Sequence, residues 1–148
     1  VYANSPAYTL VRSSWTGGTT ANFNFANGDN TCIQVNNLGF IGLVDQTERR
    51  LNVTAMTHLH LDVYLNAPLA NLFVFLLAPG DRNYSTGPLV AGWNSLSIPL
   101  TAYPGALNDI YGFKLEQNVA PSTTQIYLDN IYFSNCAPTA PIIINDII

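Results

Sequence analysis

The side chains best suited to chemistry lie in the segment THLHLD, residues 57–62. Two histidines and an aspartate at alternate positions form the pattern in which zinc hydrolases supply their first metal ligands. A catalytic zinc needs at least three converging protein ligands and an open position for water. The chain has no histidine besides His58 and His60, and Val63 rather than a further histidine follows Asp62. The ligand supply is too small, which excludes a zinc hydrolase.

A β-strand explains the same spacing more simply, because successive side chains of a strand point to opposite faces. A strand over residues 57–65 turns Leu59 and Leu61 toward a core, and it turns His60, Asp62 and Tyr64 to the other face. That polar row suits a packed or hydrogen-bonded histidine pair, and it equally suits a surface that meets a ligand. A solvated face has the same pattern, so the sequence leaves these alternatives open.

The rest of the chain predicts an all-β fold. No stretch keeps apolar residues at the helical spacing of i, i+3, i+4 and i+7, whereas short β-prone runs recur between turns rich in Gly, Pro, Asn and Asp. Short strands separated by such turns favour an antiparallel β-sandwich. The predicted strands cover residues 7–13, 31–35, 38–44, 57–65, 71–78, 94–99, 111–117 and 125–133.

The length of 148 residues suits one domain with one core. We expect this domain to occupy residues 1–136. Residues 137–141, APTAP, are typical of a linker, and the apolar segment 142–148, IIINDII, is predicted to form an extra or donated strand. The alternative is that residues 142–148 open a further domain.

Composition favours a secreted or cell-surface protein and excludes two classes of partner. Charged residues make up 9% of the chain, far below the usual share of roughly a quarter. Five Lys and Arg against nine Asp and Glu provide no basic surface for nucleic acid. No apolar run approaches the roughly 20 residues that span a bilayer, so we expect no membrane insertion.

The two cysteines, Cys32 and Cys136, lie far apart in the sequence. A disulfide between them would close a long loop and, on the chain-entropy model, stabilise the fold by roughly 4 kcal/mol. Two unpaired buried thiols are the alternative.

Four motifs occur in an order typical of one family: NNLGFIG at 36–42, MTHLHLDVYL at 56–65, GWNSLSIPL at 92–100 and YLDNIYF at 127–133. Over residues 1–135 the chain resembles a jelly-roll carbohydrate-binding module of the type appended to secreted bacterial glycoside hydrolases, notably laminarinase-type enzymes. The resemblance implies an antiparallel sandwich without catalysis of its own. It also implies a polysaccharide ligand and an attached glycoside hydrolase domain.

The resemblance further implies a structural calcium ion, with Asp129 of the LDN motif as one ligand. A second carboxylate is expected near the first strand, but Pro6 occupies that position and leaves Asn4 as the candidate. Calcium takes six to eight oxygen ligands, so amide and backbone oxygens can replace one carboxylate. The alternative is that Asp129 caps a turn or hydrogen-bonds the adjoining strand.

Sugar sites combine aromatic rings with amide, carboxylate and cationic groups. Alternation along residues 111–117 places Lys114 and Glu116 on a polar face. If this face also carries the polar row of residues 57–65, one binding surface results. Its predicted members are His60, Asp62, Tyr64, Lys114 and Glu116. The family pattern assigns Trp93 to packing, and the further aromatic candidates are Trp15, Tyr103, Tyr111 and Tyr132.

These observations predict a non-catalytic module that binds a β-glucan-like or algal polysaccharide and targets a secreted assembly or enzyme to it. The alternative is a structural subunit of an extracellular filament or adhesin, which self-assembles by adding residues 142–148 as a strand to a neighbour. An enzyme is disfavoured, because no acidic pair stands out and no nucleophile–base motif is present.

Overall fold

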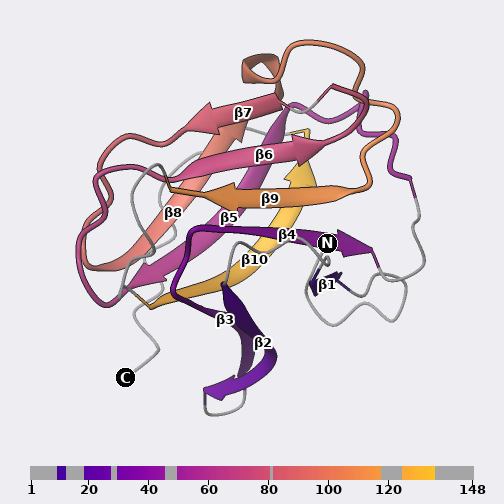
Figure 1. The fold of residues 1–148 in the computed structure, drawn as a ribbon. Coiled ribbons are helices and arrows are strands. Elements are labelled where there is room, and N and C mark those ends of the chain that lie inside the picture. The colour runs from indigo at the N-terminus through magenta and orange to yellow at the C-terminus, as the bar shows by residue number, and fades with distance from the viewer. Residues whose placement is uncertain are drawn as a thin grey trace.

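The computed structural model describes residues 10–12, 19–27, 30–45, 50–80, 82–117 and 125–135. These residues form two antiparallel five-stranded sheets that pack face to face (Figure 1). Sheet A has the strand order β1 (Leu10–Arg12), β4 (Phe40–Asp45), β9 (Gly112–Glu116), β6 (Phe73–Leu77) and β7 (Arg82–Ser85). Sheet B has the order β2 (Thr20–Asn27), β3 (Asn30–Asn36), β10 (Ile126–Ser134), β5 (His58–Leu65) and β8 (Gly92–Pro99). A single 3-10 turn, η1 (Leu100–Ala102), follows β8.

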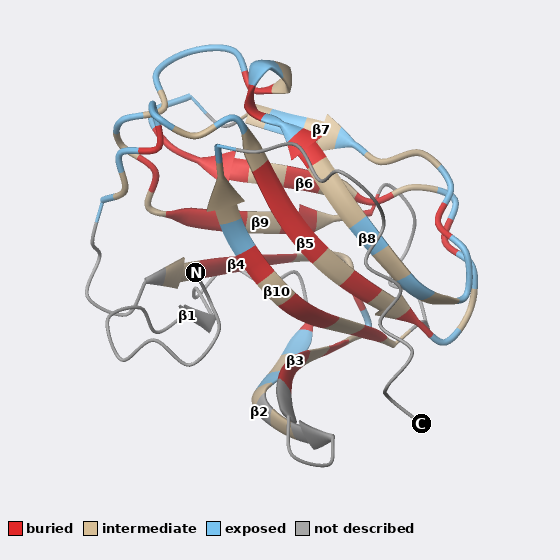
Figure 2. Cartoon of the chain, turned by 180° about the vertical axis from the view of Figure 1, so that it is seen from behind, coloured by how far each residue is buried: buried red, intermediate tan, exposed pale blue. Residues whose placement is uncertain are grey.

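The core lies between the sheets and follows the two-residue period of the strands. In β5 the alternate residues Leu59, Leu61, Val63 and Leu65 are at most 3% exposed. Figure 2 shows the same alternation of buried and less buried positions along β5 and β10. Full burial of one such side chain contributes about 1.5–3 kcal/mol, so these inward rows hold the two sheets together. The predicted β-sandwich is confirmed.

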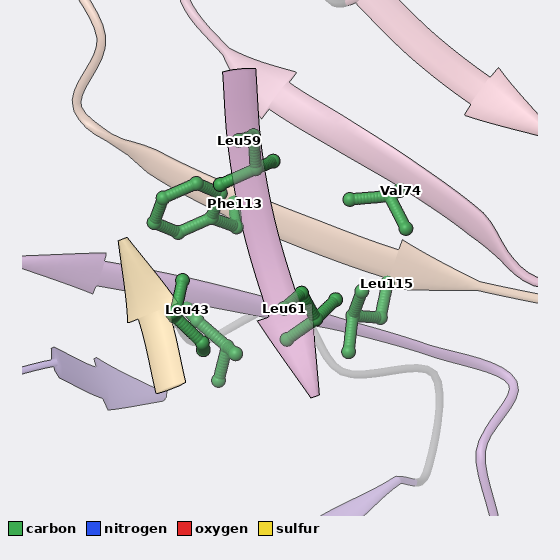
Figure 3. Close-up of a pocket in the computed structure, with 7 residues that line it drawn as sticks. Leu43, Leu59, Leu61, Val74, Phe113 and Leu115 are labelled. Carbon is green, nitrogen blue, oxygen red and sulfur yellow. The ribbon is translucent and has the colours of Figure 1, made fainter. Parts of the chain in front are cut away.

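The side chains of both sheets meet closely in the middle of the core. Figure 3 shows Leu59 and Leu61 of β5 facing Leu43, Phe113 and Leu115 of sheet A. The cavity between them has a volume of about 10 Å³, and all its lining residues are apolar. A buried water needs about that space and also polar partners. This cavity is therefore a dry packing defect and not a ligand site.

Seven predicted strands coincide with β3, β4, β5, β6, β8, β9 and β10, and β1 lies inside the range predicted at residues 7–13. The strands β2 and β7 were not predicted. Both are edge strands, and their sequences, TANFNFAN and RNYS, carry polar residues and few β-branched ones. Edge strands of native sheets are commonly short or polar, which weakens the sequence signal for them.

A β-bulge interrupts β10 between Asp129 and Tyr132, where two residues of β10, Asn130 and Ile131, lie opposite one residue of β5, Leu61. Asn130 has a positive φ of 48°, a backbone conformation that Asn tolerates better than most residues. The extra residue lets Leu128 and Ile131 both point into the core. As a result, Asp129 and Asn130 are adjacent on the outer side, where regular alternation would place only one of them.

The predicted disulfide is not present at Cys32, which is a buried free thiol. Its Sγ–H points to the carbonyl oxygen of Phe25 on the neighbouring strand, at 3.9 Å. Burial raises the pKa of this thiol, and the nearby charge of Asp129 acts in the same direction. The alternative of an unpaired buried thiol therefore holds for Cys32. Cys136, the linker and the segment 142–148 lie outside the described residues, and so does the proposed domain boundary.

Within the described ranges, no helix has the length and apolarity that crossing a membrane requires.

Candidate functional site

The outer face of sheet B carries an aromatic row that crosses its strands. Tyr127 of β10 pairs in register with Tyr64 of β5, and Tyr64 pairs with Trp93 of β8. The ring centroids of Tyr127 and Tyr64 are 5.7 Å apart, and those of Tyr64 and Trp93 are 5.5 Å apart. Phe25 extends the row on the other side, 5.2 Å from Tyr127. Strands far apart in the sequence thus supply one line of rings.

A row of polar side chains lies beside these rings, two residues away along β5 and on the same face. Asp62 of β5 pairs with Asp129 of β10 and with Ser95 of β8. The bulge in β10 brings Asn130 over this row, where its Nδ2 donates to Asp62 Oδ2 at 2.7 Å. The backbone N–H of Asn130 donates to Asp129 Oδ1, also at 2.7 Å. The row therefore offers carboxylate acceptors, an amide and a hydroxyl to a ligand on this face.

The next register step carries a histidine and a tyrosine in face-to-face contact. His60 and Tyr132 stack with centroids 4.5 Å apart and planes 16° from parallel. Tyr132 is 37% exposed, whereas His60 is only 8% exposed. His60 Nε2 and Ser134 Oγ form a hydrogen bond of 2.8 Å. His60 thus stacks against the exposed ring of Tyr132 as its neighbour on the adjacent strand.

The surroundings of His60 favour its neutral form. Burial lowers the pKa of His60 below its ordinary value, and the positive charge of His58 acts in the same direction, while Asp62 opposes both. His58 itself hydrogen-bonds to Thr57, with 2.9 Å between Nδ1 and Oγ1. Each histidine thus makes a hydrogen bond, as in the alternative of a hydrogen-bonded pair, and ligand contact by His60 stays a prediction.

The prediction that Lys114 and Glu116 share a face with the polar row of β5 is wrong. Both residues lie on β9 in sheet A, whereas His60, Asp62 and Tyr64 lie on β5 in sheet B. Phe113 and Leu115 of β9 fill the core, so Lys114 and Glu116 project from the opposite side of the sandwich. The alternation of side chains correctly predicted that the polar residues of β5 and of β9 point outward. A sandwich has two outer faces, however, and alternation does not tell them apart.

On that opposite face Lys114 and Glu116 bind each other. Lys114 Nζ lies 2.6 Å from Glu116 Oε2 and 3.9 Å from the centroid of the Phe75 ring. The ion pair and the cation–π contact satisfy the ammonium group locally. These two residues form a structural cluster on sheet A, remote from the aromatic row.

The aromatic candidates differ in their outcome. Trp93 is 40% exposed on the outer face, so assigning it to packing missed its place in the aromatic row. Tyr103 belongs to the core, where its hydroxyl donates to the Val74 carbonyl at 3.1 Å. Tyr111 lies under the guanidinium of Arg50 at 4.5 Å. Trp15 lies outside the described residues.

The sequence did not single out Tyr127, Asn130 and Ser95 as site residues. Alternation along residues 125–133 nevertheless marks Tyr127 as outward-facing.

The calcium prediction concerns Asp129 and Asn4, and Asn4 lies outside the described residues. Asp129 is 9% exposed and accepts the N–H of Asn130. In the described part of the chain, no three His, Cys, Asp or Glu side chains come together as a metal would require. Calcium binding by Asp129 and Asn4 therefore stays a prediction.

No protein-family model matches the chain, and no curated protein matches it in sequence. Solved structures do share its fold. A family 30 carbohydrate-binding module aligns with a TM-score of 0.64 at 10% identity, over 90% of this chain and 82% of that one. A family 11 module from Clostridium thermocellum, in complex with a β-1,3-1,4-mixed-linked tetrasaccharide, aligns with a TM-score of 0.59 at 13% identity, covering 90% and 91%. A family 29 module aligns with a TM-score of 0.55 at 11% identity, covering 88% and 80%.

The fold is the β-sandwich of these carbohydrate-binding modules. The resemblance found in the sequence motifs is thereby confirmed at the level of architecture. The laminarinase-type detail stays a prediction.

Proposed function

We propose that this chain is a non-catalytic module that binds a polysaccharide on the outer face of sheet B. The observation that carries the proposal is the register of Tyr127, Tyr64 and Trp93, which places three rings in a line across three strands. Aromatic rings bind the apolar C–H faces of sugars, and adjacent carboxylate and amide groups bind their hydroxyls. Asp62 and Asn130, in the polar row beside the rings, supply a carboxylate and an amide for such hydroxyls.

The tilt of the rings favours a single glycan chain over a flat crystalline surface. The ring planes of Tyr64 and Trp93 meet at 67°, and those of Tyr64 and Tyr127 meet at 72°. Such rings do not form one plane. A flexible chain can turn its sugar units to follow them, whereas the surface of a crystal cannot.

The charge of the face favours an uncharged glycan. None of the five strands of sheet B contains Lys or Arg. Asp62 and Asp129 contribute negative charge to the polar row, and they would repel the carboxylates or sulfates of an acidic polysaccharide. A neutral β-glucan is therefore the proposed ligand, and the bound state would hold a secreted enzyme or assembly at that polysaccharide.

Isothermal titration calorimetry tests this proposal with mixed-linkage β-glucan, β-1,3-glucan, cellulose, agar and alginate. We expect saturable binding of a soluble neutral glucan and none of alginate. If Tyr64→Ala loses this binding but keeps the native unfolding temperature, the binding site is the aromatic row. Absence of binding to all five polysaccharides would contradict the proposal. The filament alternative depends on residues 142–148, and no observation on the described residues favours it.

A further inference from the structure

Asn94 is a polar residue at an inward-facing position of β8. Trp93, directly before it, pairs with Tyr64 on the outer face, so alternation turns Asn94 to the inner side, opposite the fully buried Val63. Ile98 of the same strand shows what the interior normally accepts, since it is 1% exposed. Asn94 is partly buried at this strand, and its amide group forms hydrogen bonds with partners within the protein. The identity of these partners indicates what Asn94 does.

Among the described residues, the hydrogen-bond partners of Asn94 are backbone groups, and most belong to the turn that leads into β8. Its Nδ2 donates to the carbonyl oxygens of Val90 at 2.9 Å, Gly92 at 3.0 Å and Val63 at 3.3 Å. Its Oδ1 accepts the backbone N–H of Val90 at 3.1 Å. The amide therefore holds both backbone groups of Val90 and ties the turn to the neighbouring strand β5.

This turn needs an anchor because β8 is an edge strand, paired with β5 on one side only in the described structure. Gly92 opens the strand with a φ of 92°, in the left-handed region, and no atom would approach a Cβ there within 4 Å. A glycine in open space gives the chain freedom directly before Trp93. The hydrogen bonds of Asn94 restrict that freedom, because they join Val90 and Gly92 to each other and to Val63 of β5.

The anchored segment presents two exposed apolar side chains. Val90 is 65% exposed and Trp93 is 40% exposed. Besides Tyr132, they are the exposed large apolar residues among those the structure describes. Since one amide fixes the backbone of Val90 and the start of the strand that carries Trp93, both side chains project from an anchored segment of backbone.

We infer that Asn94 is a positioning residue that pre-organises Trp93 and Val90 as the β8 end of the glycan-binding surface. The inference rests on the proposed function. A binding group held by the fold binds more tightly than one that must be ordered by the ligand, because ordering costs free energy. Asn94 touches no ligand itself and acts through the backbone of the turn.

The test compares Asn94→Ala with Val74→Ala, a core variant in sheet A that loses stability without touching the turn. Each is measured for glucan affinity and for acrylamide quenching of Trp93 fluorescence, well below its unfolding temperature. Parallel samples that also carry Trp93→Phe give the fluorescence of Trp15, which is subtracted to leave the signal of Trp93. Asn94→Asp serves as a second variant if Asn94→Ala does not fold, because the carboxylate can accept the Val90 N–H but cannot donate to the three carbonyls.

We expect Asn94→Ala to increase the quenching of Trp93 and to raise Kd about fivefold to tenfold, while Val74→Ala keeps the native values of both. Native quenching and native Kd in Asn94→Ala, with only a fall in unfolding temperature, would overturn the inference. If the native chain binds no polysaccharide, the proposed function fails, but the quenching still decides whether Asn94 positions Trp93.

Discussion

His60 and Tyr132 face each other across two paired strands, with ring centroids 4.5 Å apart and planes 16° from parallel. The histidine is buried, whereas the tyrosine is partly exposed. This arrangement explains why a histidine-rich strand occurs in a protein without a metal-binding cluster among its described residues. The imidazole stacks on an aromatic side chain, and burial lowers the pKa of His60, which favours its uncharged form.

The first prediction concerns the pH dependence of stability. His60 has a lower pKa in the folded chain than its ordinary value of 6.5. Between these two values the unfolded chain binds more protons, so the free energy of unfolding decreases as pH falls through 6.5 and toward the lowered value. Above pH 6.5 His60 is neutral in both states, and its full contribution to the free energy of unfolding is present. Urea unfolding at a series of pH values measures it.

His60→Gln serves as the test variant, because glutamine keeps a polar group near Ser134 but does not titrate. We expect it to flatten the pH dependence in this window. His58→Gln removes only the charge that adds to the effect of burial on the pKa of His60, so we expect it to reduce the pH dependence without abolishing it. An unchanged slope in His60→Gln would show that another group causes the dependence.

The second prediction concerns the centre of the aromatic row. Tyr64 contacts both Trp93 and Tyr127, so Tyr64→Ala removes the ring that links them. We expect glucan affinity to fall about tenfold, which corresponds to about 1.4 kcal/mol. The half-buried side chain leaves the core residues on the inner side of β5 in place, so the protein should remain folded. Calorimetry with circular dichroism on the same sample checks both statements.

The third prediction tests the separation of the two outer faces. Lys114→Met keeps an unbranched side chain against Phe75 but removes the ion pair with Glu116. We expect glucan affinity to stay native, and the free energy of unfolding to change by at most about 1 kcal/mol, as for a partly exposed pair. A loss of affinity comparable to that of Tyr64→Ala would return Lys114 to the binding surface.

The fourth prediction concerns the close approach of two strands in sheet A. A Cβ added at Gly112 would overlap the carbonyl oxygen of Leu43 and lie 3.0 Å from the Cα of Val44. Both contacts are with backbone, which cannot move without disturbing β4. We expect Gly112→Ala to lower the free energy of unfolding by about 3 kcal/mol. Denaturant unfolding measures this change.

Glu116→Ala on the same strand is the control for Gly112→Ala, because the Glu116 side chain projects outward and pairs with Lys114 on the surface of sheet A. It should cost less than about 1 kcal/mol. Equal losses in the two variants would show that the crowding at Gly112 is relieved by a small backbone shift.

Local patterns of the sequence were sufficient for most strands and for their inward faces. The inward position of Leu59 and Leu61 follows from alternation alone, because the side-chain period is a property of each strand by itself. The outward position of Asp62 and of Lys114 follows in the same way. The ligand count around His58 and His60 excluded a zinc hydrolase without any coordinates.

Only the tertiary structure decided which outward-facing residues meet. Strand pairing brought Tyr127 beside Tyr64 and placed Lys114 on the other sheet, and the bulge in β10 carried Asn130 to Asp62. The exposure of Trp93 and the free thiol of Cys32 depend on the same pairings. Period and polarity are set by neighbours along the chain, whereas strand order and register are set by the packing of the whole core, which no short segment encodes.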